Sequence, residues 1–180
     1  MTEDLFLGLD AGSVSLDAVM VDASGAVVAS ALAITSGRTR DTLARVIEDL
    51  ARTLPGARVA GVGSTGSGRK LVAGIVGGTT LNEITAHARG ACLSLPEGIP
   101  CSLIEMGGQD SKFMEVQRHG ESVEVLDYSM NTLCAAGTGV FLDGQAERLG
   151  ITAEELGLMA ASAPRAAEVA GRCSVFAITS

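Results

Sequence analysis

The sequence predicts an α/β protein built from two similar lobes, residues 1–98 and 99–180. Strand-like and helix-like segments alternate along the chain, and their order in the first half is repeated in the second. Each half opens with three short apolar segments separated by turn residues, which is typical of an antiparallel meander, and then continues into a helix. A glycine turn follows the first strand of each half. We therefore expect two lobes that face each other, with one glycine turn from each lobe at the cleft.

The composition indicates a globular protein. Of the 180 residues, 47% are hydrophobic and only 19% are charged, so a disordered chain would leave much apolar surface in water. The net charge of -8 disfavours a duplex nucleic-acid partner, because phosphate binding needs clustered Lys and Arg. The acidic start lacks the features of a signal peptide, and no apolar run approaches the ~20 residues that span a membrane. We expect a cytoplasmic protein with neither a nucleic-acid nor a membrane partner.

The first lobe is expected to begin with a meander and to end with helices. Apolar segments predict strands at residues 5–9, 16–21 and 26–34. The clearest helix spans residues 41–54, where Leu43, Val46, Ile47, Leu50 and Leu54 recur at helical spacing before Pro55-Gly56 ends the pattern. A strand at 58–63 and helices at 67–76 and 82–93 complete the lobe.

The second lobe repeats this order. Strands are expected at residues 101–106, 111–117 and 122–126, followed by helices at 138–149 and 152–163. The last segment, residues 169–180, carries no capping or terminal pattern, so the second lobe looks unfinished. We expect the chain to be a fragment of a longer protein.

The first glycine turn, Asp10 to Ser13, is a candidate phosphate-binding loop. Gly12 lets backbone amides approach an anion, Ser13 adds a hydroxyl, and Asp10 can hold a hydrated magnesium ion. Taken alone, a short D-x-G-S string is more often an ordinary hairpin turn.

The second glycine turn, Glu105 to Asp110, strengthens the interpretation because it lies at the matching place in the second half. The amides of Gly107 and Gly108 can bind a terminal phosphate, with both acidic residues beside them for a metal ion or water. Neither a P-loop string nor a Rossmann fingerprint is present in the sequence. The two turns together predict a split site for the phosphates of ATP.

Two of the four cysteines are candidate metal ligands. Cys134 precedes a glycine turn and a predicted helix, where backbone amides and the helix dipole stabilise a thiolate, and Cys173 also lies beside a glycine. Two cysteines cannot complete the four-thiolate shell of a cubane cluster. Two chains around a dyad would bring four thiolates to one cluster on the axis.

These residues resemble the ATP-dependent activators of 2-hydroxyacyl-CoA dehydratases and the related ATPase subunits of benzoyl-CoA reductase. The motifs that carry the resemblance are L-D-A-G-S at 9–13, T-G-S-G-R at 65–69, N-E-I at 82–84, H-A-R-G-A at 87–91, I-E-M-G-G-Q-D-S-K at 104–112, C-A-A-G-T-G at 134–139 and R-C-S-V-F-A at 172–177. The resemblance covers most of the chain. It implies the actin/sugar-kinase/heat-shock-chaperone ATPase fold and a homodimer that holds one 4Fe-4S cluster between its two subunits.

The resemblance also implies the roles of individual residues. It makes Cys134 and Cys173 the ligands of the 4Fe-4S cluster. It assigns the binding of ATP and Mg²⁺ to the residues of the two turns, which are Asp10, Gly12, Ser13, Glu105, Gly107, Gly108 and Gln109, with Asp110 beside them. Among these, Glu105 and Gln109 are the expected catalytic residues.

The function that the resemblance implies is an ATPase coupled to electron transfer in an anaerobic cytoplasm. Its implied partners are an iron-sulfur dehydratase or reductase, which receives one electron, and a low-potential donor such as ferredoxin or flavodoxin. Which CoA ester the partner enzyme reduces is not implied.

Three departures from the family pattern affect these expectations. Asp17 stands where many members carry a lysine, four residues after the serine of the first loop, so one contact to phosphate charge is missing or supplied elsewhere. Glu105 replaces the usual aspartate of the compact activators, and E-x-G-G-Q-D-S-K is more similar to the long fused activases. The family's adenosine-binding glycine motif is not found before Ser180, so we expect the fragment to bind nucleotide poorly and to be inactive by itself.

The other chemically active side chains favour structural roles. Cys92 and Cys101 match no cluster position and are expected to be buried, small apolar residues. His87 and Arg89 lie on a predicted helix and, by the resemblance, shape the surface between the lobes. Lys112 follows the second loop and could neutralise phosphate charge, but lysines on strands usually reach solvent.

Two functions of other classes remain open. A small-molecule kinase of the same fold would need a catalytic base near its substrate pocket and would have no use for Cys134 and Cys173 together. A non-hydrolysing assembly domain would follow if the first loop, with Asp17, no longer supports ATP hydrolysis.

Overall fold

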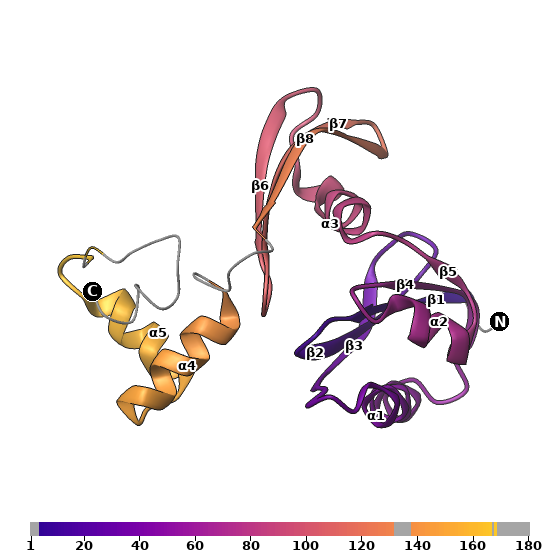
Figure 1. The fold of residues 1–180 in the computed structure, drawn as a ribbon. Helices are drawn as coiled ribbons and strands as arrows, with labels where there is room; N and C mark the ends of the chain where they lie inside the picture. The colour runs from indigo at the N-terminus through magenta and orange to yellow at the C-terminus, as the bar shows by residue number, and fades with distance from the viewer. Residues whose placement is uncertain (1–3, 132–137, 167, 169–180) are drawn as a thin grey trace. The chain divides into compact units, whose positions relative to one another are not determined.

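The computed structural model describes residues 4–131, 138–166 and 168 (Figure 1). It divides the chain into two compact units, Met1–Gly90 and Ala91–Ser180. The main cluster of buried hydrophobic residues lies entirely in the first unit. None of the described helices has the length and apolar character needed to cross a lipid bilayer.

The first unit is a five-stranded sheet with helices packed on it. Its elements are β1 (Asp4–Ala11), β2 (Ser15–Val21), β3 (Val27–Ile34), α1 (Thr39–Thr53), β4 (Arg58–Thr65), α2 (Arg69–Val76), β5 (Thr79–Thr80) and all but the last residue of α3 (Glu83–Ala91). The strand order is β3-β2-β1-β4-β5. The first three strands form the expected antiparallel meander, and β4 and β5 continue the sheet in parallel on the other side of β1.

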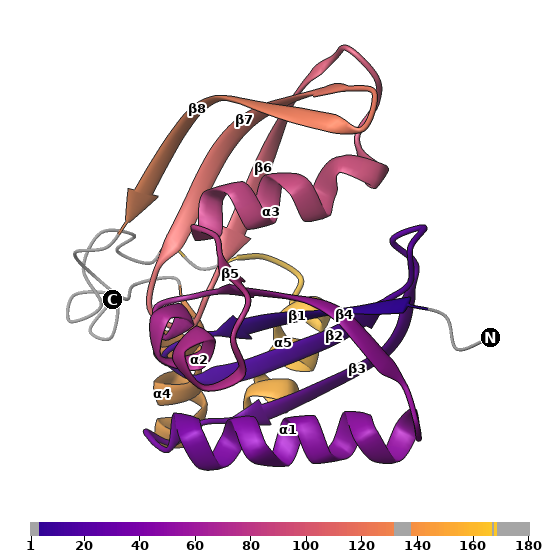
Figure 2. The ribbon, with the colours of Figure 1, turned by 90° about the vertical axis from the view of Figure 1, so that its right-hand side faces the viewer.

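One face of this sheet forms the core. Side chains alternate across a strand, so β1 buries Leu5, Leu7 and Leu9 on one face and directs Asp10 to the other. The helix α1 packs on β2 and β3 while α2 packs on β4 and β1, and both contribute side chains to the same buried cluster (Figure 2). Asp10 therefore lies on the face of the sheet opposite these two helices.

The second unit contains a three-stranded antiparallel sheet and two helices. Its elements are a 3-10 turn, η1 (Cys92–Ser94), β6 (Pro100–Met106), β7 (Ser111–His119), β8 (Ser122–Asn131), α4 (Gly139–Leu149) and α5 (Ala153–Ser162). The strand order is β6-β7-β8. The helix α4 is capped by Gly150, which has a φ of 70° that glycine adopts without strain, and α5 begins with a capping box between Thr152 and Glu155.

The expected elements are present with shifts of a few residues at their ends. The sequence did not predict β5, which has only two residues, and it ended the last strand at residue 126 rather than at Asn131. Residues 127–131 include Asp and Asn, which are rare in strands. They are nevertheless held in the ladder because each pairs with a residue of β7, as Asn131 does with Ser111.

Candidate functional site

The first loop joins the end of β1 to the start of β2 in the meander of the first unit. In this hairpin Asp10 stands opposite Asp17, and Ala11 opposite Leu16. Asp10 is partly buried and Ser13 is exposed. The hydroxyl of Thr35 donates to the carbonyls of Ser13 and Val14 at 3.3 and 3.0 Å. These bonds hold the part of the loop that leads into β2.

Asp17 lies on β2 and faces a second acidic residue, Asp10, across the hairpin. Its Oδ2 accepts a hydrogen bond of 2.8 Å from the hydroxyl of Ser15. Since residues that stand opposite each other in an antiparallel pair lie on the same face, Asp10 and Asp17 bring two carboxylates to one surface of the sheet.

The turn between β4 and α2 packs directly against the first loop. Gly66 has a φ of +88°, and a Cβ at that position would lie 2.5 Å from both the carbonyl oxygen of Ala11 and Oδ1 of Asp10. The amide of Gly68 donates to the same Ala11 carbonyl at 2.8 Å, and the Arg69 guanidinium donates to the carbonyl of Gly66 at 2.9 Å. Only glycine allows this approach, so residues 65–69 form one wall of the first loop.

Thr65 contributes a buried hydroxyl to the same place. It is paired with Asp10 across the parallel strands β1 and β4, so the two side chains point to the same face. Its Oγ1 is buried and has no hydrogen-bond partner among the residues that the structure describes. Native structures rarely leave such a group unsatisfied, because doing so costs about 1–3 kcal/mol. Thr65 opens the T-G-S-G-R motif at 65–69 but is not among the residues predicted for the site.

The second loop joins β6 to β7 and is closed by a buried lysine. Lys112 stands opposite Glu105 in the hairpin. Its Nζ donates to Oε2 of Glu105 at 2.7 Å and to Oδ1 of Asp110 at 3.0 Å, and only 2% of its side chain is exposed. The expectation that this lysine reaches solvent is wrong. It lies on the buried face of β7 with Met114 and Val116, and two carboxylates compensate its charge there.

The glycines of the second loop are held from both sides. The amide of Gly107 donates to the carbonyl of Asp110 at 2.9 Å. At the start of α4, the amide of Gly139 donates to the carbonyl of Gly107 at 3.0 Å and that of Val140 to the carbonyl of Gly108 at 2.9 Å. Among the described residues, the amides of Gly108 and Gln109 have no acceptor. Within the described part of the chain, these two peptide N–H groups are therefore available to an anion.

The other cysteines and the helix residues singled out in the sequence lie outside these two loops. Cys134 and Cys173 lie outside the described residues. Cys92 is 4% exposed, which confirms its expected burial, whereas Cys101 is only partly buried. His87 is partly buried on α3 and Arg89 is exposed. Within residues 4–131 and 138–166, no group of three or more His, Cys, Asp and Glu side chains is arranged to hold a metal ion.

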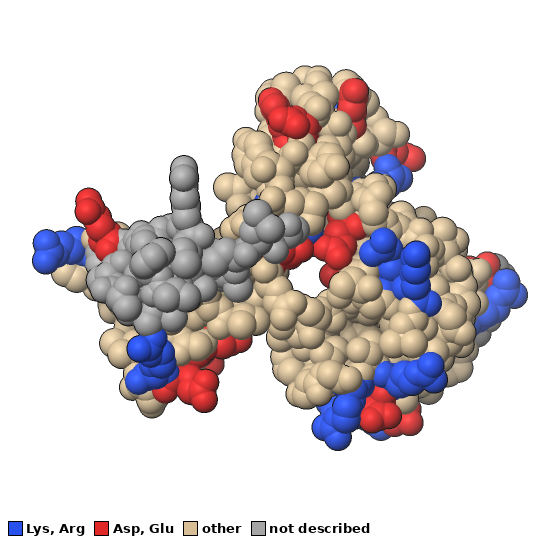
Figure 3. All heavy atoms as spheres, in the orientation of Figure 1, with Lys and Arg blue, Asp and Glu red and all other residues tan. Residues whose placement is uncertain are grey.

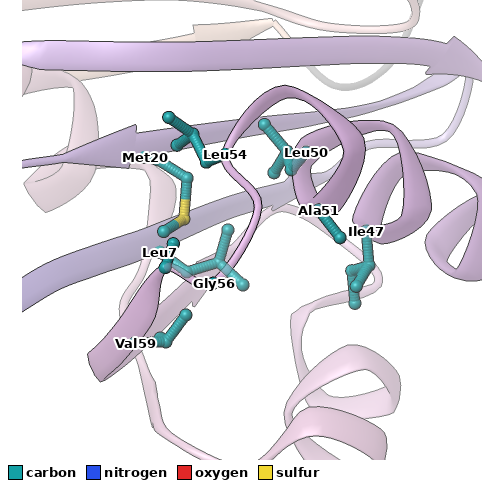
Figure 4. A pocket seen from close by; sticks show the side chains of 9 residues that line it. Leu7, Met20, Ile47, Leu50, Ala51, Leu54, Gly56 and Val59 are labelled. Atoms are coloured by element: carbon teal, nitrogen blue, oxygen red, sulfur yellow. The ribbon is translucent and has the colours of Figure 1, made fainter. Parts of the chain in front are cut away.

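Two features lie away from the loops. On the visible face of each unit, Lys and Arg side chains stand singly or in small groups and do not merge into one basic surface (Figure 3). A cavity of about 160 Å³ in the first unit lies between the end of α1 and the sheet (Figure 4). Its lining is Leu7, Met20, Ile47, Leu50, Ala51, Leu54, Gly56, Ala57 and Val59, so it offers no charged side chain to a phosphate.

Residues 7–180 match the BadF/BadG/BcrA/BcrD ATPase family. The chain is 33% identical over 173 residues to the 2-hydroxyisocaproyl-CoA dehydratase activator of Clostridioides difficile, covering 95% of this chain and 62% of that protein. It is 31% identical over 182 residues to the (R)-2-hydroxyglutaryl-CoA dehydratase activating ATPase of Acidaminococcus fermentans, covering 95% of this chain and 64% of that protein. The chain thus spans less than two thirds of the length of these relatives.

A solved structure extends the similarity to the fold. The activator of the 2-hydroxyisocaproyl-CoA dehydratase from Clostridium difficile, with bound ADPNP, aligns with a TM-score of 0.83 at 32% identity. The alignment covers 97% of this chain and 63% of that one. The predicted α/β fold, that of the actin/sugar-kinase/heat-shock-chaperone ATPases, is confirmed.

Proposed function

This chain belongs to the BadF/BadG/BcrA/BcrD ATPase family, and on that premise we propose that it binds Mg-ATP through its two glycine turns and acts as part of an activase. An activase in this sense is an ATPase that drives one-electron transfer to a partner CoA-ester dehydratase or reductase. One observation carries the proposal. In each unit a carboxylate stands at the end of the first strand, a glycine turn follows it, and the second strand returns beside it.

The first loop has the donor set that a phosphate group and a hydrated magnesium ion require. Asp10 offers a carboxylate, Ser13 an exposed hydroxyl, and the backbone around Gly12 has no side chain in the way. The buried hydroxyl of Thr65 lies on the same face as Asp10 and lacks a partner among the described residues. A phosphate oxygen or a metal-bound water would satisfy it, so the residues present fit the ligand.

The second loop suits a terminal phosphate. The amides of Gly108 and Gln109 are available as donors within the described part of the chain, and the start of α4 lies against the same turn. We assign to Glu105 and Gln109 the orientation of the attacking water, and to Asp110 a place beside the phosphate. A bound magnesium ion would neutralise charge on the phosphate oxygens. The protein's own part is to position these groups before the ligand arrives.

The electron carrier in this proposal is a 4Fe-4S cluster shared by two copies of the chain. Cys134 and Cys173 from each copy would provide the four thiolates that such a cluster needs. The cluster, when bound, supplies the low-potential electron, and a donor such as ferredoxin or flavodoxin would restore it. The support for this step is the residue type at the two positions and the family to which the chain belongs.

Nucleotide binding is tested by calorimetry with ADPNP in the presence and absence of Mg²⁺. We expect weak but Mg-dependent binding by the unaltered chain, and a substantial loss in Asp10→Asn and Ser13→Ala. Asp22→Asn, which removes the charge of an acid in the turn between β2 and β3, is the matched control and should bind as the unaltered chain does. An absence of Mg-dependent binding would count against the ATP site.

The cluster is tested by anaerobic, iron-replete expression. We expect a brown protein with about four irons per dimer, lost in Cys134→Ala and in Cys173→Ala but kept in the control Cys92→Ala. A colourless protein that binds Mg-ADPNP would favour the kinase reading. A colourless protein that also fails to bind Mg-ADPNP would favour the assembly domain, for which the facing carboxylates of Asp10 and Asp17 are the structural argument.

A further inference from the structure

We propose that Lys112 is a positioning residue of the second loop, which holds the carboxylates of Glu105 and Asp110 in place for the ligand without touching the ligand itself. The inference rests on the proposed function of that loop as a phosphate site. Both carboxylate oxygens lie within hydrogen-bond distance of the same ammonium nitrogen, at 2.7 and 3.0 Å.

Because Lys112 is buried, we infer that it does not contact a phosphate group directly. Its side chain is 2% exposed, whereas those of Glu105 and Asp110 are 20% and 31% exposed. The carboxylates therefore have access to solvent, and the ammonium group lies behind them. A ligand that enters this loop would meet the acidic side chains first, and the lysine would act on it only through them.

The two bonds also fix the shape of the turn. Glu105 is the penultimate residue of β6 and Asp110 directly precedes β7, so Lys112 ties together the two ends of the loop. A Cβ on Gly107 would lie 3.0 Å from Oδ1 of Asp110 and 3.3 Å from Oε1 of Glu105. The carboxylates of Glu105 and Asp110 thus lie close to Gly107, next to the residues whose amides are available as donors. A movement of either carboxylate would therefore change the conformation of the loop.

The first unit shows that a hairpin of this kind forms without the lysine. The residue that faces Asp10 there is Asp17, at the position equivalent to that of Lys112 opposite Glu105, and the strands β1 and β2 remain in continuous register. A buried lysine is costly unless its partners are well placed, and removing one member of a buried pair is strongly destabilising. The hairpin therefore does not need a lysine at this position in order to form. The positive charge of Lys112 is better explained by its fixing the positions of the Glu105 and Asp110 carboxylates.

The chain has only two lysines, Lys70 and Lys112, which makes the test specific. Lys70 is exposed on α2 and provides the matched control. We expect Lys112→Met to weaken Mg-ADPNP binding by about tenfold or more, as loss of a group that orients metal or phosphate ligands does. Lys112→Arg, which keeps the charge, should recover most of this loss, and Lys70→Met should bind as the unaltered chain does.

A spectroscopic measurement accompanies the binding series and does not depend on whether Lys112→Met folds. In protein labelled with ¹³C-lysine, the Cε signal of Lys112 should shift when Mg-ADPNP is added, while that of Lys70 stays in place. Binding by Lys112→Met within about twofold of the unaltered chain, a difference too small to reflect a lost positioning group, or a Lys112 signal that does not move, would overturn the inference. Failure of the unaltered chain to bind would instead contradict the proposed function.

Discussion

The substitution Gly66→Ala tests the close approach between the β4–α2 turn and the first loop. A methyl group at this position would lie 2.5 Å from the carbonyl oxygen of Ala11 and from Oδ1 of Asp10. The Ala11 carbonyl belongs to β1 and already accepts a bond from Gly68, so it cannot easily move away. The residue also has a φ of +88°, which costs roughly 1–2 kcal/mol for a residue with a Cβ.

The control for this substitution is Gly25→Ala. Gly25 has almost the same φ, +85°, but a Cβ there would meet nothing within 4 Å. Urea unfolding of both variants therefore separates backbone strain, which they share, from steric contact, which only Gly66→Ala adds. We expect the control to lose roughly 1–2 kcal/mol and Gly66→Ala to lose about 1–3 kcal/mol more, in the range found for overpacked sites.

Gly66→Ala should also lower affinity for Mg-ADPNP, because the methyl group displaces the carboxylate of Asp10. Gly25→Ala should bind as the unaltered chain does. Equal losses of stability in the two variants, with unchanged nucleotide affinity in Gly66→Ala, would refute the argument that residues 65–69 form a wall of the first loop.

Three further predictions follow from single contacts. Thr65→Val should leave the free energy of unfolding unchanged or raised, since it removes a buried hydroxyl without a described partner, yet it should weaken Mg-ADPNP binding in calorimetry. Asp17→Lys should tighten nucleotide binding at low salt and lose this gain at high salt, because it places a cation beside Asp10. Hydrogen bonds from the amide and hydroxyl of Thr152 lower the pKa of Glu155, so their contribution to stability is present above the unfolded-state pKa and is lost as pH falls through the lower folded-state value. Thr152→Ala should therefore destabilise the chain more at neutral than at strongly acidic pH in thermal unfolding.

Much of the fold could be predicted from local patterns. The apolar runs and intervening turns located both meanders, and the spacing of Leu43, Val46 and Leu50 located α1 with the face that it buries. These signals depend on residues close in sequence. The two-residue strand β5 carries no such signal, because only its pairing with β4 defines it.

The contacts of the candidate site were harder to predict because they join distant residues. Thr65 reaches the first loop only through the parallel pairing of β4 with β1, which the local pattern does not reveal. The burial of Lys112 depends on which face of β7 is covered. Counting across the predicted hairpin from Glu105 would have placed Lys112 opposite it, and the same count places Asp17 opposite Asp10.

The second loop has a mechanical role within the second unit because it is connected to two other elements. Asn131, at the end of β8, is paired with Ser111, the residue that follows Asp110. Gly139, at the start of α4, donates its amide to the carbonyl of Gly107. A displacement of the second loop would therefore move the end of β8 and the start of α4 together.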